Sequence, residues 1–156
     1  MINTDNPARL GSRILAILYD CLIAFFLVFI ITLILQQAII QLELVTLEQV
    51  QISKDTTAPA IPNDSFVLTA LRSLWFILPL FYFGHYWTKR GQTPGMKVWK
   101  VIALNQNGSL MSWTQAVMRY VFALFGLGLL WMIFNKERLP LQDQVSKTYL
   151  TKITKN

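Results

Sequence analysis

Three charged side chains stand inside long apolar segments of the chain, where they could carry chemistry. Asp20, Arg72 and Arg119 are each the one full charge in an apolar block of 22 residues. A charge in hydrocarbon costs at least about 2.5 to 3.5 kcal/mol on insertion scales, so it normally faces a partner or a wet cavity. The pattern therefore predicts either an ion or proton path, or an ion pair that holds helices together.

Depth along the helices predicts which of these charges meet. If the first block enters a membrane at Arg13, Asp20 lies about 10 Å deeper on the same helix face, and Arg119 lies about 9 Å from the same side. Arg72 lies about 10 Å from Asp20 toward the outer side of the membrane, and its side chain can extend back toward the start of its own helix. The sequence thus predicts that Asp20 pairs with Arg119, either as a structural pin or as part of a path.

The other reactive residues give little support to an enzyme. Cys21 and His85 are the only cysteine and histidine, so the chain cannot supply a Cys/His zinc cluster or an internal disulfide. No G-x-S-x-G, Walker A or G-x-G-x-x-G string is present. His85, beside Tyr86 and Trp87, fits an aromatic belt better than a proton relay. We expect a protein that is not an enzyme and that binds neither a metal nor a cofactor.

Three apolar blocks must position the charges. They cover residues 14–35, 66–87 and 113–134. Each would be about 33 Å long as a helix, against a hydrocarbon core of about 30 Å. The chain is 54% hydrophobic and only 14% charged, whereas globular proteins average roughly 25% charged residues. These features predict an integral membrane protein in which the first two blocks are transmembrane helices.

Charges between the blocks predict the orientation. The loop 41–65 holds four acids and one lysine, whereas the loop 88–112 holds four bases and no acid. Because positive loops stay in the cytoplasm, we expect the N-terminus and the loop 88–112 inside and the loop 41–65 outside, in the inner or plasma membrane of the cell. The net charge of +6 then reflects orientation and contact with anionic lipid, and we expect no nucleic-acid partner.

The third block, 113–134, conflicts with this rule. A full span would place the tail 135–156, with five bases and two acids, outside. Gly126 and Gly128 could instead break the helix, so that the segment dips into the bilayer and returns. An unbroken third span remains the alternative, since glycine is common in membrane helices.

Two stretches of the polar segments have strand character. Residues 96–104, the turn at Asn107-Gly108 and residues 109–113 predict a cytoplasmic hairpin, and residues 147–153 are also strand-like. If these stretches pair, the tail must lie on the inner side. The outer stretch 56–62 is expected to be irregular, with Asp64 or Ser65 capping the second helix. The predicted fold is an all-α membrane domain over 8–151, with two to three transmembrane helices, a third segment that either spans or is broken and re-entrant, and a small β-hairpin.

Several short motifs occur in order along the chain. Ala8-Arg9-Leu10-Gly11-Ser12-Arg13 is followed by Ala16 and Asp20, then by Gly91-Gln92-Thr93-Pro94-Gly95-Met96-Lys97, Trp113, Arg119-Tyr120 and Leu141-Gln142-Asp143. Together they resemble the RDD family, which is named for one arginine and two aspartates. The first motif is similar to that family's first helix and the second to its Gly-Gln-Thr-x-Gly-Lys motif, and the last stands where the family has Leu-His-Asp. The departures are Gln142 in place of His, the inserted Met96, and Lys100 where a glycine often stands.

The resemblance implies that Arg13, Asp20 and Asp143 are the residues that give the family its name. If the third segment dips and returns, Asp143 lies near the start of the first helix, where it can pair with Arg13. The alternative is a solvated charge at each position. The absence of the motif histidine leaves no support for a proton transfer that would use it.

Two classes of function stay open at this point. One is a transport-related protein for an unidentified ligand or for cation/proton exchange, as the resemblance suggests. The other is a non-transporting membrane module that assembles with or regulates another protein. Because two or three helices enclose little space, we expect a homo-oligomer or a partner membrane protein in either case.

Overall fold

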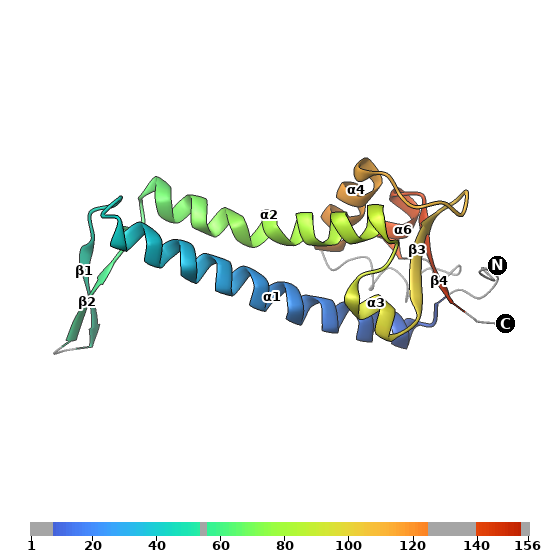
Figure 1. Cartoon of the computed structure of the whole chain (residues 1–156), viewed down its shortest axis with the longest axis horizontal. Helices are drawn as coiled ribbons and strands as arrows, with labels where there is room; N and C mark the ends of the chain where they lie inside the picture. The colour runs from blue at the N-terminus through green and yellow to red at the C-terminus, as the bar shows by residue number, and fades with distance from the viewer. Residues whose placement is uncertain (1–7, 54–55, 125–139, 154–156) are drawn as a thin grey trace. The chain divides into compact units, whose positions relative to one another are not determined.

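The computed structural model describes residues 8–53, 56–124 and 140–153 (Figure 1). Its helices are α1 (Leu10–Gln41), α2 (Phe66–Lys89), α3 (Pro94–Val98), α4 (Trp113–Leu124) and α6 (Leu141–Val145), and its strands are β1 (Glu48–Ser53), β2 (Thr56–Ala60), β3 (Val101–Asn105) and β4 (Thr148–Lys152). The chain divides into two compact units, one formed by residues 1–23 with 80–156 and the other by residues 24–79. We call them the terminal unit and the hairpin unit.

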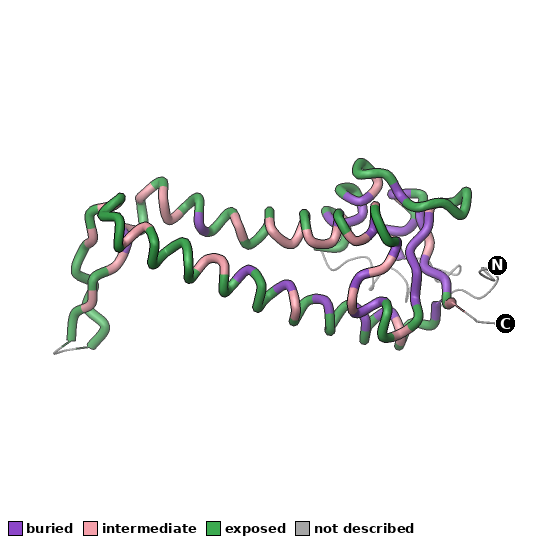
Figure 2. Tube along the Cα trace, viewed as in Figure 1, coloured by how far each residue is buried: buried purple, intermediate pink, exposed green. Residues whose placement is uncertain are grey.

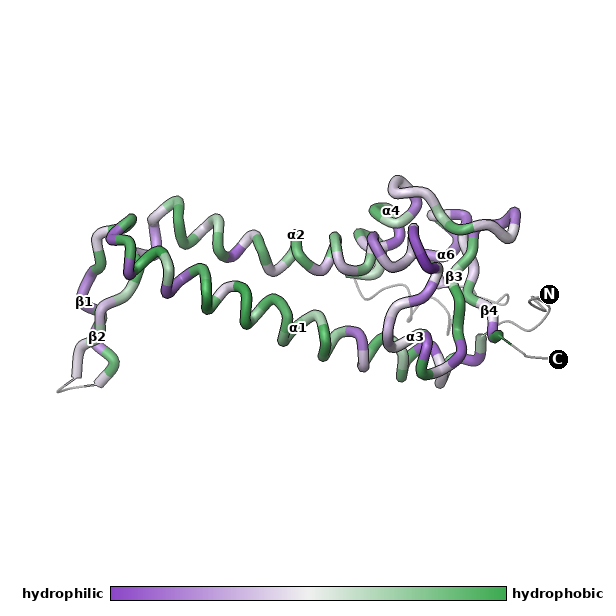
Figure 3. The backbone as a smooth tube through the Cα atoms, in the orientation of Figure 1, coloured by the Kyte–Doolittle hydropathy of each residue, from purple (hydrophilic) through white to green (hydrophobic). Residues whose placement is uncertain are grey.

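The helices α1 and α2 are long and apolar enough to cross a membrane. Both begin and end close to the predicted blocks, but α1 extends further at each end. Only 22% of the most apolar window of α1 and 6% of that of α2 is buried within the protein. Figures 2 and 3 show that exposed turns of α1 are mostly hydrophobic, whereas α2 alternates hydrophobic and more polar turns. The core helix of a soluble protein would show the opposite, because it hides its apolar side chains.

The buried face of α1 in the terminal unit is the polar one. Arg13, Ala16 and Asp20 are 2 to 3% exposed, whereas Leu18 and Leu22 are each 60% exposed. Residues three and four apart share a helix face, so this narrow stripe of charged and small residues faces protein. The predicted common face of Arg13 and Asp20 is confirmed.

The hairpin unit contains a feature that the sequence did not predict. The strands β1 and β2 pair antiparallel, from Glu48 with Ala60 to Ser53 with Thr56, where an irregular stretch was expected. Ser65 accepts a hydrogen bond from the Leu68 amide through its Oγ, so the expected cap of α2 is confirmed for this residue.

Pairing of β3 with β4 builds the terminal unit. The two strands run antiparallel from Val101 with Lys152 to Asn105 with Thr148, and they lie side by side in Figure 1. The tail therefore pairs with the loop after α2, as the strand-like residues 147–153 suggested. The predicted hairpin of 96–104 with 109–113 is wrong: the turn at Asn107-Gly108 forms, but α3 occupies the first part and the partner strand comes from the tail. An all-α fold needs the same correction, since the mostly helical chain carries two small antiparallel sheets.

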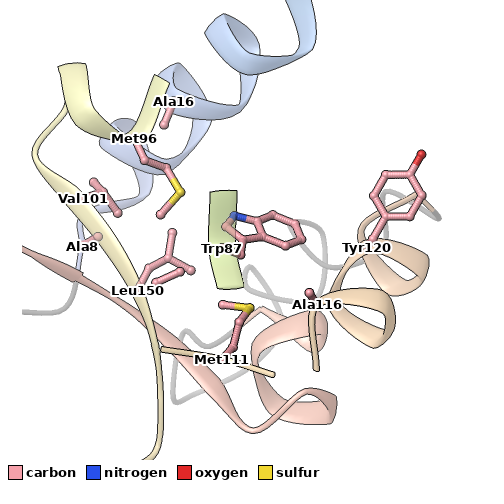
Figure 4. Packing of buried hydrophobic residues seen from close by; sticks show 10 residues of the cluster. Ala8, Ala16, Trp87, Met96, Val101, Met111, Ala116, Tyr120 and Leu150 are labelled. Atoms are coloured by element: carbon pink, nitrogen blue, oxygen red, sulfur yellow. The ribbon is translucent and has the colours of Figure 1, made fainter. Parts of the chain in front are cut away.

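A compact apolar core fills this unit. Figure 4 shows side chains from both long helices, α3, α4 and both strands gathered around Trp87. Val101 and Ala103 are completely buried, and Met96 and Met111 are 5% and 2% exposed. Burying such apolar surface stabilises the unit by roughly 25 cal/mol per Å².

The third apolar block is helical where the structure describes it. Helix α4 covers Trp113–Leu124, up to the last residue that the structure describes in this block. Gly126 and Gly128, at which a break was predicted, lie outside the described residues.

Candidate functional site

Three charged residues from distant parts of the chain meet in the terminal unit. Asp143 Oδ2 lies 2.9 Å from Arg13 Nη1, and Asp143 Oδ1 lies 2.7 Å from Arg119 Nη1. The side chains are only 1 to 6% exposed. Oδ1 makes no hydrogen bond in the described part of the chain. Its contact with Arg119 is therefore a close ion pair whose angles do not meet those of a hydrogen bond. We call these three residues the Asp143 triad.

Each arginine of the triad also binds groups that belong to the tail. Arg13 donates from Nε to the Ala8 carbonyl at 2.9 Å and from Nη2 to the Leu150 carbonyl at 3.3 Å. Arg119 donates from Nη1 to Thr148 Oγ1 at 2.6 Å, and its guanidinium lies 5.3 Å from the centre of the Trp87 ring. The triad therefore joins the start of α1, the middle of α4, the short helix α6 and strand β4.

The predicted pair of Arg13 with Asp143 is confirmed, and the predicted pair of Asp20 with Arg119 is wrong. Matching depth alone suggested the second pair. In the structure Arg119 instead reaches Asp143, because α6 and β4 bring an acid from the tail to α4. No ion pair joins Asp20 to Arg119, both of which the structure describes.

Asp20 binds the loop after α2. Its Oδ2 accepts a short hydrogen bond from the Thr93 hydroxyl, and its Oδ1 accepts a bond of 2.8 Å from the Gly95 amide and one of 3.4 Å from the Tyr82 hydroxyl. Thr93 is also the cap of α3, accepting from the Met96 amide at 3.2 Å. We call Asp20, Thr93 and Gly95 the Asp20 joint, because they fasten α3 to α1.

The loop motif around Gly91 and Gly95 serves this joint. A Cβ on Gly95 would lie 2.4 Å from the Ala16 carbonyl oxygen and 2.8 Å from Asp20 Cγ, so only glycine permits this close approach. Gly91 has a φ of +65°, which favours glycine. Gln92 donates from Nε2 to the Val101 carbonyl at 2.7 Å and so ties the loop to β3. All four motif residues are thus used in packing α3 and β3.

The backbone conformation of Lys100 explains why the resemblance would lead one to expect a glycine at this position. Its φ is +53°, a left-handed value that is unfavourable for a residue with a Cβ. A glycine often stands at this position of the family, and the backbone shows why. The sequence could have signalled this turn only through that comparison.

The candidates Arg72 and His85 lie apart from the Asp143 triad. Arg72, in the hairpin unit, donates to Asn63 Oδ1 at 3.0 Å, which confirms that it extends toward the start of α2. His85 contacts Tyr86 edge to face. No group of three His, Cys, Asp or Glu side chains in the described ranges could hold a metal. Sequence reasoning missed Tyr82 and Thr148, which carry no motif signal.

The comparisons with known proteins agree with these motifs. The model of the RDD family matches residues 7–147, nearly the whole chain. No curated protein and no solved structure matches the chain.

Proposed function

Since the chain belongs to the RDD family, we propose that it is a multi-pass protein of the inner or plasma membrane that serves as a non-transporting assembly or regulatory module. In this proposal the terminal unit lies at the cytoplasmic end of the two spanning helices. The excess of bases in the loop 88–112 and before α1 supports this orientation. The exposed apolar faces of α1 and α2 would contact lipid, a second copy or a partner membrane protein.

The observation that carries the proposal is the internal pairing of the charges. Arg13 and Arg119 are bound to Asp143, and Asp20 is bound to Thr93 and Gly95. Ionisable groups inside a membrane protein pair with protein groups or mark an ion path, and the direct contacts of these three residues and Asp20 are all with protein groups. Here these charges hold the tail, α3 and α4 against α1, which is the work of a structural centre.

The same pairing bears on the third apolar block. Because β4 pairs with β3 and Asp143 pairs with Arg13, the tail lies beside the start of α1 and the loop after α2. With these parts inside, the block between Trp113 and the tail would enter the bilayer and return on the same side. This supports the re-entrant form over a third full span.

Transport is the second candidate, and one observation favours it. Asp20 and Arg119 both line a cavity in the terminal unit, and a carboxylate beside a cavity could bind a cation. Two spanning helices enclose little space, so a path through the membrane would need further copies.

Reconstitution into proteoliposomes separates the two functions. We expect no flux of protons or sodium ions above that of empty vesicles, measured with an entrapped pH dye and with ²²Na⁺, and we expect native mass spectrometry to detect an oligomer. The control is Asp20→Asn, provided that its melting temperature shows a folded protein. Flux through the wild type that this variant abolishes would overturn the proposal and support transport.

A further inference from the structure

A cavity of about 210 Å³ lies within the terminal unit, between the start of α1, the end of α2, α4 and the tail. Arg13, Asp20, Arg119 and Gln142 are the charged and amide side chains in its wall, and most of the rest is apolar. An apolar cavity of about 150 Å³ holds benzene. This one is larger, so it can take a molecule or part of a molecule of about ten non-hydrogen atoms.

The wall has an unused hydrogen-bond acceptor. Gln142 is 7% exposed, and its Oε1 has no hydrogen-bond partner among the residues that the structure describes. A buried polar atom without a partner is costly, by about 1 to 3 kcal/mol. The terminal torsion of a glutamine is broad, so the carboxamide can turn this oxygen toward the cavity to meet a donor.

The charges around the cavity balance. Arg13, Arg119 and Asp20 line the cavity. Asp143 lies behind the wall, paired with both arginines, so two positive and two negative charges surround the cavity. A charged head group would therefore gain no net attraction and would lose its hydration. The chemistry favours a neutral molecule that donates a hydrogen bond.

The rim of the cavity is apolar and exposed. Ile17 of α1 is 39% exposed and Leu124 of α4 is 53% exposed, and both line the cavity. The surroundings of this rim rest on the proposed function: with α1 and α2 spanning a membrane, such a rim would open toward the hydrocarbon rather than toward water. A ligand would reach the cavity from the bilayer.

We propose that this cavity binds a neutral amphiphile from the bilayer, with a hydroxyl or amide N–H group bonded to Gln142 and an apolar chain against Ile17, Phe83 and Leu124. The site goes beyond the assembly role, since it gives the terminal unit a small-molecule ligand. It uses Gln142 at the position where the family motif has histidine, so the proposal concerns this chain in particular.

Cys21 provides a direct probe of occupancy. It lines the cavity, is exposed, and is the only cysteine of the chain. The experiment measures the rate at which N-ethylmaleimide labels Cys21 in detergent micelles, with increasing 1-octanol or n-nonane, which have equal numbers of non-hydrogen atoms. A Cys21→Ala, Leu22→Cys variant is the matched control, because Leu22 is exposed on the same helix and is not among the lining residues.

We expect 1-octanol to slow the labelling of Cys21 at least about threefold and to leave the control site unchanged. In Gln142→Leu, the preference for the alcohol over the alkane should fall at least about fivefold, the effect of losing one buried hydrogen bond. Comparing both ligands in both proteins removes the contribution of their partition into the micelle. Ala123 lines the cavity and is exposed. Ala123→Phe adds volume there and should abolish protection without lowering the melting temperature.

Three results would overturn the proposal. They are no slowing by 1-octanol, equal slowing at the control site, and an alcohol preference that Gln142→Leu leaves unchanged. If Gln142→Leu does not fold, the wild-type preference and the Ala123→Phe variant decide, because protection that persists with the rim filled places the alcohol elsewhere.

Discussion

Replacing Asp143 with asparagine tests whether the triad holds the terminal unit together. The substitution keeps the shape of the side chain but leaves Arg13 and Arg119, which are 3% and 5% exposed, without a counter-ion. Removing one partner of a buried ion pair costs about 3 to 5 kcal/mol. Domains have free energies of unfolding of about 5 to 15 kcal/mol, so Asp143→Asn should unfold much of the terminal unit.

The charges of the triad predict that its members contribute unequally to the stability of the terminal unit. The triad carries one net positive charge, from two arginines and one aspartate. Arg119→Met removes that excess and leaves the Arg13–Asp143 pair intact, so it should cost about 1 kcal/mol or less, chiefly for the lost bond to Thr148. Combined with Asp143→Asn, it should restore about 0.5 to 3 kcal/mol, because one unpaired buried charge disappears.

The assay is unfolding by sodium dodecyl sulfate in mixed micelles, followed by tryptophan fluorescence, since Trp87 lies in the core beside Arg119. We expect the order of stability to be wild type, Arg119→Met, the double variant and Asp143→Asn. If Arg119→Met is as unstable as Asp143→Asn, or if the double variant is no better than Asp143→Asn, the charges do not stabilise the unit in this way.

Four further results are expected. Gly95→Ala should lower stability by about 1 to 3 kcal/mol, as overpacking does, in the same mixed-micelle titration; an unchanged midpoint would contradict the close approach to α1. Asp20→Asn should cost about 1 to 2 kcal/mol through weaker bonds to a neutral acceptor, whereas Arg72→Gln should leave the midpoint within error; equal losses would refute the joint. Lys100→Gly should raise the free energy of unfolding by about 0.5 to 1 kcal/mol, because glycine adopts the left-handed conformation of this residue without strain; a lower free energy of unfolding would show that the turn is not strained. A reporter fused after Asn156 should be active in the cytoplasm, on the same side as one inserted in the loop 88–112. Reporters on opposite sides of the membrane would contradict the pairing of β3 with β4.

How far the sequence predicted the site differed from residue to residue. Arg13 and Asp143 were paired correctly, because the re-entrant form and the motif positions placed both near the start of the first helix. The predicted pair of Asp20 with Arg119 was wrong, because equal depth in a membrane does not show which other segments of the chain pack between the two side chains. The partners of Asp20 are a threonine hydroxyl and backbone or aromatic donors, whose positions depend on where α3 docks.

The fold shows the same division. Composition and the length of the apolar runs by themselves determined the two long helices, because a run of about 20 apolar residues in a chain with few charges has lipid as its favourable surrounding. Loop charges likewise determined the expected orientation. Local pattern could not determine strand partners, since β3 pairs across more than forty residues with β4 and any strand-like stretch offers the same backbone groups.

Only the tertiary structure decided which charge meets which. An ion pair depends on distances of about 3 to 4 Å, and those distances arise when the tail, α4 and the start of α1 pack on one core. The sequence supplied two arginines and two aspartates that needed partners; folding assigned Asp143 to both arginines and gave Asp20 to the loop.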